Sequence, residues 1–299
     1  MTAAAPEPTR LQRIMKAAPV RIAVLVMIFF WTIPTFGVLV SSFRSPDDID
    51  STGWWTVFTN PFDPSQWTLG NYADVITDDG MGDAFINSII VAVPATILPI
   101  TIAAFAAYAF AWMDFPGRGL LFALVIALLV VPLQMTLIPI LELYGNLELS
   151  GTFLGLWLAH TGFGLPLAVY LLYSYISQLP KDMLEAAFVD GASHYDAFVK
   201  LVIPLSMPAI ASFAIFQFLW VWNDLLVALV FNQRNPVVTV ELSELVGSKG
   251  QDWHLLTAGE IHSIVEHHNV VLALQAIYGL GREDGSGEGE PPETHTPTS

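Results

Sequence analysis

Long apolar runs alternate with shorter polar segments along most of this chain. Five of these runs are long enough to cross about 30 Å of hydrocarbon as helices, because a helix rises about 1.5 Å per residue. They cover residues 22–43, 84–113, 120–141, 152–179 and 209–231. The pattern therefore predicts an all-α, polytopic membrane protein.

A sixth stretch, residues 254–281, is a weaker candidate for a membrane span. Its second half is apolar, but its first half carries acidic and histidine side chains (Glu260, His262, Glu266, His267 and His268). Each charge at the centre of a span costs about 2.5–3.5 kcal/mol on an insertion scale. We therefore expect about six transmembrane helices if this segment inserts and five if it does not.

The composition agrees with a membrane protein and excludes several other classes. Hydrophobic residues make up 54% of the chain, and charged residues 13%, about half the share in a soluble domain. The absence of cysteine excludes disulfide bridges and thiolate chemistry. A net charge of −16 argues against a nucleic-acid partner, and the sequence contains no phosphate-binding loop of the GxxxxGK type.

The basic residues predict which side of the membrane each segment faces. With six spans and an inner N-terminus, eight of the 11 lie in inner segments and three in outer ones. The inner ones are Arg10, Arg13, Lys16, Arg21, Arg118, Lys181, Lys200 and Arg282, and the outer ones are Arg44, Arg234 and Lys249. Five spans give seven against four and the same orientation for residues 181–208. The positive-inside rule thus predicts a cell-membrane protein with a cytoplasmic N-terminal tail (1–21), a membrane domain (22–281) and a disordered acidic tail (282–299).

Residues 181–208 form a polar and charged segment between two long apolar runs, and the rule places them in the cytoplasm. Apolar residues recur at helical spacing on both sides of Gly191 (Leu184, Ala187 and Phe188 before it; Tyr195, Phe198 and Val199 after it). We expect Gly191 to end the first helix. The segment is therefore predicted to be a helix–turn–helix hairpin parallel to the membrane. From the pattern alone, it either lies on lipid headgroups or docks a partner in water.

The same segment carries a motif. Glu185-Ala186-Ala187, Asp190-Gly191-Ala192 and Ile203-Pro204 follow one another at the spacing of the EAA signature, and this stretch resembles the permeases of ABC importers. Other stretches are similar to carbohydrate permeases, nearest to the maltose-type inner subunit (Asn71-Tyr72, Phe85-x-Asn87-Ser88, residues 132–139 and residues 216–224). The segments TNPFDP and WHLLTAG resemble sequences of the alpha-glucoside branch of that family.

The resemblance implies that the hairpin is a coupling helix seated in a cleft of a separate ATPase subunit. The residues implied in coupling are Glu185, Ala186, Ala187, Phe188, Asp190, Gly191, Tyr195 and Pro204. Glu185 would pair with a base on the ATPase, Gly191 would allow the turn, and Phe188 and Tyr195 would be apolar anchors. The implied partners are ATPase subunits, a second permease, a solute-binding protein, a carbohydrate and the lipid bilayer. ATP hydrolysis would belong to the partner, so we expect this chain to be no enzyme by itself and to need no cofactor.

Polar residues within the spans are candidates for the substrate path, because ionisable groups in a membrane face the bundle interior by default. The candidates are Gln217, Asn223 and Asp224 in the fifth run, together with His160 and Gln134. The alternative is that they bond to a neighbouring helix or lie near the outer boundary of the membrane.

Three other functions stay open at this point: a secondary transporter or channel, an intramembrane metalloenzyme and a non-sugar importer of the same architecture. Residues 260–269 depart from the family pattern. Three accounts of this departure compete. The first is natural divergence, the second is an altered reading frame or an engineered segment, and the third is a metal site built on His262, Glu266 and His267.

Overall fold

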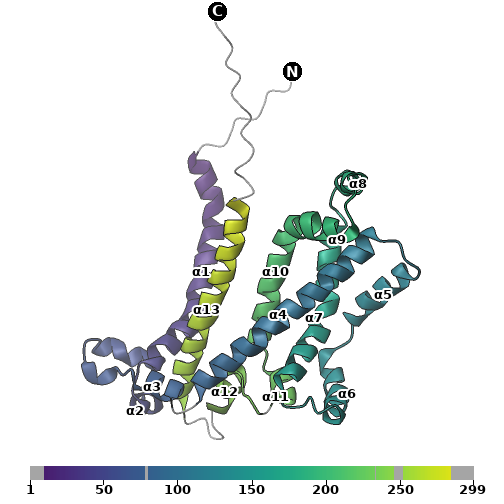
Figure 1. The fold of residues 1–299 in the computed structure, drawn as a ribbon. Helices are drawn as coiled ribbons and strands as arrows, with labels where there is room; N and C mark the ends of the chain where they lie inside the picture. The colour runs from purple at the N-terminus through teal and green to yellow at the C-terminus, as the bar shows by residue number, and fades with distance from the viewer. Residues whose placement is uncertain (1–9, 78–79, 233, 246–251, 284–299) are drawn as a thin grey trace, which may run out of the picture. The chain divides into compact units, whose positions relative to one another are not determined.

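The structure is a computed structural model, and it describes residues 10–77, 80–232, 234–245 and 252–283. Every regular element in these ranges is a helix, which confirms the all-α prediction (Figure 1). The described residues form two compact units. The first comprises those within 1–79 and 245–262, and the second those within 80–244 and 263–299.

The first unit holds the first predicted span and the polar segment that follows it. Its elements are α1 (Arg10–Ser42), α2 (Pro46–Ser51), η1 (Trp54–Thr59), η2 (Pro64–Gln66), α3 (Gly70–Thr77) and the beginning of α13 (Trp253–Glu283). Helix α1 begins before the predicted start at residue 22, because the preceding Ala, Leu, Arg and Lys residues favour a helix. The first nine residues of the predicted N-terminal tail lie outside the described residues, as do residues 284–299 of the predicted acidic tail.

Hydrogen bonds to backbone carbonyls fold the segment after α1. The guanidinium of Arg44, only 2% exposed, donates to the carbonyl oxygens of Asp48 at 3.0 Å and Thr52 at 3.1 Å. The Asn71 amide donates to the carbonyl oxygens of Ser42 at 3.0 Å and Arg44 at 2.8 Å. These bonds satisfy backbone groups that a short, irregular segment would otherwise leave unpaired.

The second unit holds the four predicted spans over residues 84–113, 120–141, 152–179 and 209–231. Its elements are α4 (Met81–Trp112), α5 (Arg118–Leu128), α6 (Leu133–Asn146), α7 (Phe153–Ile176), α8 (Lys181–Val189), α9 (His194–Ala197), the π-helix η3 (Phe198–Val202), α10 (Ile203–Trp222), α11 (Leu226–Phe231) and α12 (Val238–Leu245). Helices α4, α7 and α10 pack against one another. Buried alanines on α4 let these helices approach closely (Ala92, Ala95, Ala103, Ala104 and Ala107).

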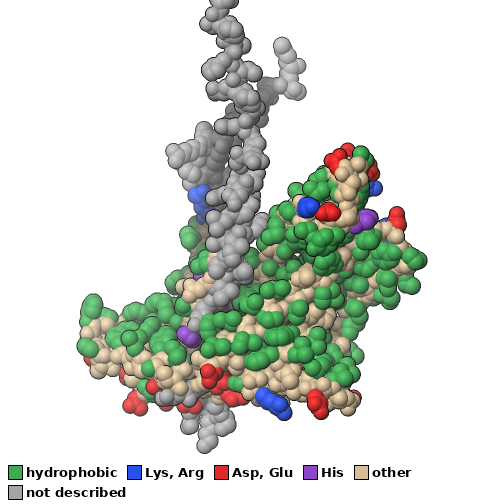
Figure 2. Space-filling model, viewed as in Figure 1, with side chains coloured by type: hydrophobic (Ala, Val, Ile, Leu, Met, Phe, Trp, Pro, Cys, Tyr) green, Lys and Arg blue, Asp and Glu red, His purple; other side chains and the backbone are tan. Residues whose placement is uncertain are grey.

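Helix α8 lies at one end of the second unit, and α6 and α11 lie at the other (Figure 1). Figure 2 shows apolar side chains over the helices between these ends and charged side chains gathered at the ends themselves. This distribution is the one expected of a bundle that crosses a membrane.

Two of the predicted spans are not single helices. The third run, predicted as one helix over 120–141, breaks between α5 and α6, whose axes meet at 101°. Pro132 precedes α6 directly, and a proline cannot supply the amide that an unbroken helix needs there. The fifth run, predicted over 209–231, ends its helix at Trp222 and resumes as α11 only at Leu226.

Within the described ranges, four helices are long and apolar enough to cross a membrane, or five if the bent α5–α6 pair counts as one span. Helix α13 covers the weaker sixth candidate but is not among these helices. A sixth span therefore stays a prediction.

Candidate functional site

The first limb of the predicted hairpin is helix α8, and its end is built around Gly191. Gly191 has φ +89°, a left-handed conformation that glycine adopts without strain. Its amide donates to the Phe188 carbonyl at 3.1 Å, and the Ala192 amide donates to the Ala187 carbonyl at 2.9 Å. These two bonds form a Schellman motif. The prediction that Gly191 ends this helix is confirmed.

The second limb begins at a capping box. The Asp196 amide donates to the Ser193 hydroxyl at 3.1 Å, and the Ser193 amide donates to the Asp196 carboxylate at 3.4 Å. Lys200 Nζ lies 2.6 Å from the other carboxylate oxygen of Asp196. From His194 the chain runs without a break through η3 and α10 to Trp222.

The second limb thus begins with a short helix, α9, which η3 joins to α10 without an intervening loop. That the hairpin lies parallel to the membrane stays a prediction. Pro204, one of the predicted coupling residues, lies in the first turn of α10, where a proline is tolerated. The wider turn of η3 directly before it accommodates the missing amide.

Most of the predicted coupling residues lie together on the exposed surface of the hairpin. Glu185 and Ala186 are exposed, and Glu185 makes no hydrogen bond or ion pair with any residue that the structure describes. Phe188 is 37% exposed and Tyr195 is 68% exposed. The hairpin therefore presents a surface with an unpaired carboxylate and two aromatic rings.

A hollow of about 420 Å³ lies between the two limbs, and Ala187, Asp190 and Gly191 line it together with Asp196 and Lys200. Phe198, predicted as part of the second apolar stripe, is instead buried in the core of the second unit. Pro204 is exposed at the start of α10 and does not line the hollow.

The sequence did not reveal a polar and aromatic contact that holds the hairpin to α4. The Tyr108 hydroxyl lies 2.9 Å from His194 Nδ1, and the ring of His194 lies 4.9 Å from that of Phe188. The Phe198 ring lies 5.2 Å from Tyr108 and 4.7 Å from Phe105. This aromatic chain joins α8 and η3 to the end of α4. Tyr108 is a tyrosine in an alanine-rich span, and that is the only signal that the sequence offers.

We expect Tyr108→Phe to loosen the hairpin without unfolding the bundle. The variant keeps the ring but loses one hydrogen bond, worth about 0.5–1.5 kcal/mol, so amides of α8 and α9 should exchange with deuterium roughly two- to ten-fold faster. Tyr173→Phe is the matched control, because the Tyr173 hydroxyl makes no hydrogen bond with a described residue. Unchanged exchange in Tyr108→Phe, or equal changes in both variants, would contradict the anchoring role.

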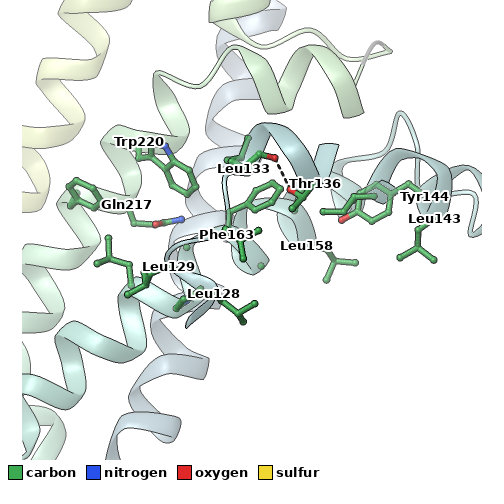
Figure 3. Close-up of a pocket in the computed structure, with 18 residues that line it drawn as sticks. Leu128, Leu129, Leu133, Thr136, Leu143, Tyr144, Leu158, Phe163, Gln217 and Trp220 are labelled. Atoms are coloured by element: carbon green, nitrogen blue, oxygen red, sulfur yellow. Dashed lines mark hydrogen bonds between the residues drawn. The ribbon is translucent and has the colours of Figure 1, made fainter. Parts of the chain in front are cut away.

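A second candidate site is a pocket of about 570 Å³ lined by residues of α5, α6, α7 and α10 (Figure 3). Its lining is mainly apolar, with polar atoms from Thr136, Tyr144, Gln217 and Trp220. Gln217 is 1% exposed, and its amide donates to the Ala95 carbonyl at 3.2 Å. The predicted path residue Gln217 thus borders the pocket and also ties α10 to α4.

Asn223 and Asp224 lie between α10 and α11, and neither lines this pocket. The Asp224 carboxylate accepts from the backbone amides of Val227 at 3.3 Å and Ala228 at 3.0 Å, so it caps α11. His160 Nε2 lies 3.8 Å from the same carboxylate. Asn223 and Asp224 thus lie at a break in the fifth run and not within one continuous helix, because Asp224 supplies the acceptors for the first amides of a new helix. Their role in the substrate path stays a prediction.

The remaining candidate residues differ in their burial. Gln134 is exposed on α6 and does not line the pocket, and His160 is buried on α7. The side chains of Glu266 and His267, from the alternative metal site, lie outside the part of the chain that the structure describes.

Comparisons with known proteins place this architecture among transport proteins. The family model described as "Binding-protein-dependent transport system inner membrane component" matches residues 99–244, which include the hairpin. The osmoprotective compounds uptake permease protein GgtD of Synechocystis sp. is 60% identical, over 90% of this chain and 91% of GgtD. The alpha-glucoside transport system permease protein AglG of Rhizobium meliloti is 40% identical, over 90% of this chain and 97% of AglG.

A solved structure shares the fold. A bacterial ABC transporter involved in the import of the acidic polysaccharide alginate contains a chain that superposes with a TM-score of 0.68 at 20% identity. The match covers 91% of this chain and 99% of that one.

Proposed function

This chain belongs to the family of binding-protein-dependent transport system inner membrane components, and on that premise we propose that it is a permease subunit of an ABC sugar importer. It forms part of the translocation path and receives the movement of a partner ATPase through the hairpin. Support for a sugar cargo comes from AglG, which is described as an alpha-glucoside permease.

The observation that carries the proposal is the exposed surface of the hairpin. An unpaired carboxylate at Glu185 beside the exposed rings of Phe188 and Tyr195 is suited to dock a basic, apolar-lined cleft on another protein. The Schellman motif at Gly191 fixes the angle between the limbs, so the hairpin moves as one body. Because α7 leads into the hairpin and α10 leads out of it, a displacement of the hairpin re-aims both helices.

The proposal includes partners and an orientation. ATPase subunits supply hydrolysis, a second permease completes the path, and a solute-binding protein delivers the sugar from outside. The N-terminus and the hairpin face the cytoplasm, since Arg118, Lys181 and Lys200 lie in the same predicted inner segments. Gln217 and Trp220 are among the polar and aromatic side chains of the 570 Å³ pocket that a sugar would meet.

Uptake by the reconstituted complex tests this function. The permease, its partner permease and the ATPase are placed in vesicles with the binding protein, and entry of labelled α-glucosides is followed. Uptake that requires ATP and all subunits is the expected result. Uptake by this chain without an ATPase would favour a secondary transporter instead.

We expect Glu185→Lys to lower ATP-driven uptake at least about ten-fold at normal membrane abundance. The substitution would place a cation against the base expected on the ATPase, and mispaired charges at an interface cost about 2–5 kcal/mol. Glu142→Lys is the matched control, because Glu142 is exposed on α6 at the opposite end of the unit. Vesicle uptake and co-purification of the ATPase are the measurements, and normal uptake by Glu185→Lys would refute the pairing.

A further inference from the structure

The first unit carries exposed aromatic side chains that belong to neither the hairpin nor the pocket described above. Trp55, Phe58, Phe62 and Trp67 are 62%, 57%, 95% and 39% exposed, respectively. They lie on η1 and on the turns that follow it. We call these four residues the aromatic patch. Large exposed aromatics of this kind mark a surface that something covers.

Contacts with α1 fix the height of the patch along that helix. The Phe36 ring stacks on Phe58 with centroids 6.4 Å apart and meets Trp54 edge to face at 5.9 Å. A Cβ atom on Gly37 would lie 2.8 Å from Trp54 Nε1, so this glycine provides the space for the indole. Phe36 and Gly37 of α1 therefore form a surface on which η1 packs.

The part of α1 that contacts η1 lies before the C-terminal end of that helix. Phe36 precedes the last residue of α1, Ser42, by six residues, which is about 9 Å along the helix axis. The segment after α1 therefore folds back beside the helix instead of projecting away from it. If the bilayer boundary lies at the end of α1, that depth is the headgroup layer and the adjoining edge of the hydrocarbon, where Trp and Phe side chains are favoured.

Several polar groups around the patch are bonded within the segment itself. Trp67 Nε1 donates to the Pro61 carbonyl at 3.1 Å, and the Gln66 amide donates to the Asn60 carbonyl at 2.6 Å. The hydroxyls of Thr56 and Thr59 donate to backbone carbonyls at 2.7 Å. A sugar or protein site would direct free donors and acceptors at its ligand, whereas internal bonding lowers the cost of contact with lipid.

We propose that the aromatic patch is an interfacial anchor that lies in the lipid headgroup region at this end of α1. It holds α1 at a fixed depth, while the acidic side chains of α2, including Asp47 and Asp50, face water. The inference requires only that α1 crosses a bilayer, and it is independent of the cargo and of the ATPase.

Spin labels test the proposal in the complete transporter embedded in phosphatidylcholine–phosphatidylglycerol nanodiscs. The chain has no cysteine, so single cysteines at Phe58, Phe62 and Asp50 can each be labelled specifically. Collision rates with oxygen, which concentrates in lipid, and with a water-soluble nickel chelate are then compared. We expect the oxygen-to-nickel ratio to be several-fold higher for Phe58→Cys and Phe62→Cys than for Asp50→Cys.

Two outcomes would overturn the anchor. Ratios at positions 58 and 62 equal to that at position 50 would place the patch in water. Labels shielded from both reagents would place it against another protein subunit. Phe62 keeps the test valid if Phe58→Cys disturbs the packing on Phe36, because Phe62 is 95% exposed and its replacement removes little packing.

Discussion

Gly191→Pro should reduce ATP-driven uptake about 100-fold while the protein still inserts in the membrane. Proline fixes φ near −65°, whereas Gly191 has φ +89°, so the hairpin cannot keep its present turn. The substitution also removes the amide that donates to the Phe188 carbonyl at 3.1 Å. A local cost of about 3 kcal/mol is sufficient for a loss of this size, since each 1.4 kcal/mol is about ten-fold.

Gly191→Asn is the matched control for this prediction. Asparagine tolerates the left-handed conformation better than most residues, and nothing lies within 4 Å of a Cβ atom added at Gly191. Uptake by this variant should stay close to normal. Normal uptake by Gly191→Pro at normal abundance would refute the coupling role, and equal losses in both variants would show that the turn geometry is not the cause.

Gly164→Val should destabilise the crossing of α7 and α10. A Cβ atom at Gly164 would lie 2.7 Å from both polar atoms of the Gln217 amide, which is buried and bonded to the Ala95 carbonyl. Gln217 can move aside only by losing that bond. Overpacking and an unsatisfied amide each cost about 1–3 kcal/mol, so the unfolding midpoint in detergent should fall by about 5–15 °C.

Gly162→Val provides the comparison on the same helix. Gly162 is exposed, and nothing lies within 4 Å of an added Cβ atom there, so the unfolding midpoint should change little. Intrinsic fluorescence during heating measures both variants. A drop of the same size in Gly162→Val would mean that valine weakens α7 by itself and that the contact with Gln217 is not responsible.

The sequence predicted features that depend on local patterning. Long apolar runs indicated an all-α membrane protein, and the spacing from Glu185 through Gly191 to Pro204 identified the importer family; both predictions are confirmed. Gly191 was correctly expected to end a helix because left-handed helix ends favour glycine. The roles of the hairpin residues toward an ATPase stay predictions.

Features that depend on tertiary contacts or on hydrogen bonds of single side chains were not predictable from the sequence. Hydropathy treats Asp224 as a polar residue within an apolar run, although its carboxylate starts a new helix by capping it. The contact between Tyr108 and His194 joins residues 86 positions apart in the sequence. Gln217 looks like a path residue until its bond to the Ala95 carbonyl, 122 positions away, is known.

The junction between the hairpin and α10 determines how far a movement of the hairpin can travel. All residues from His194 to Trp222 are helical, so no loop separates the second limb from α10. The π-helix η3 and Pro204 follow each other at this junction, and both are common causes of a bend in a helix. A displacement of the hairpin would therefore reach the Asp224 end of α10 only as far as this junction is stiff.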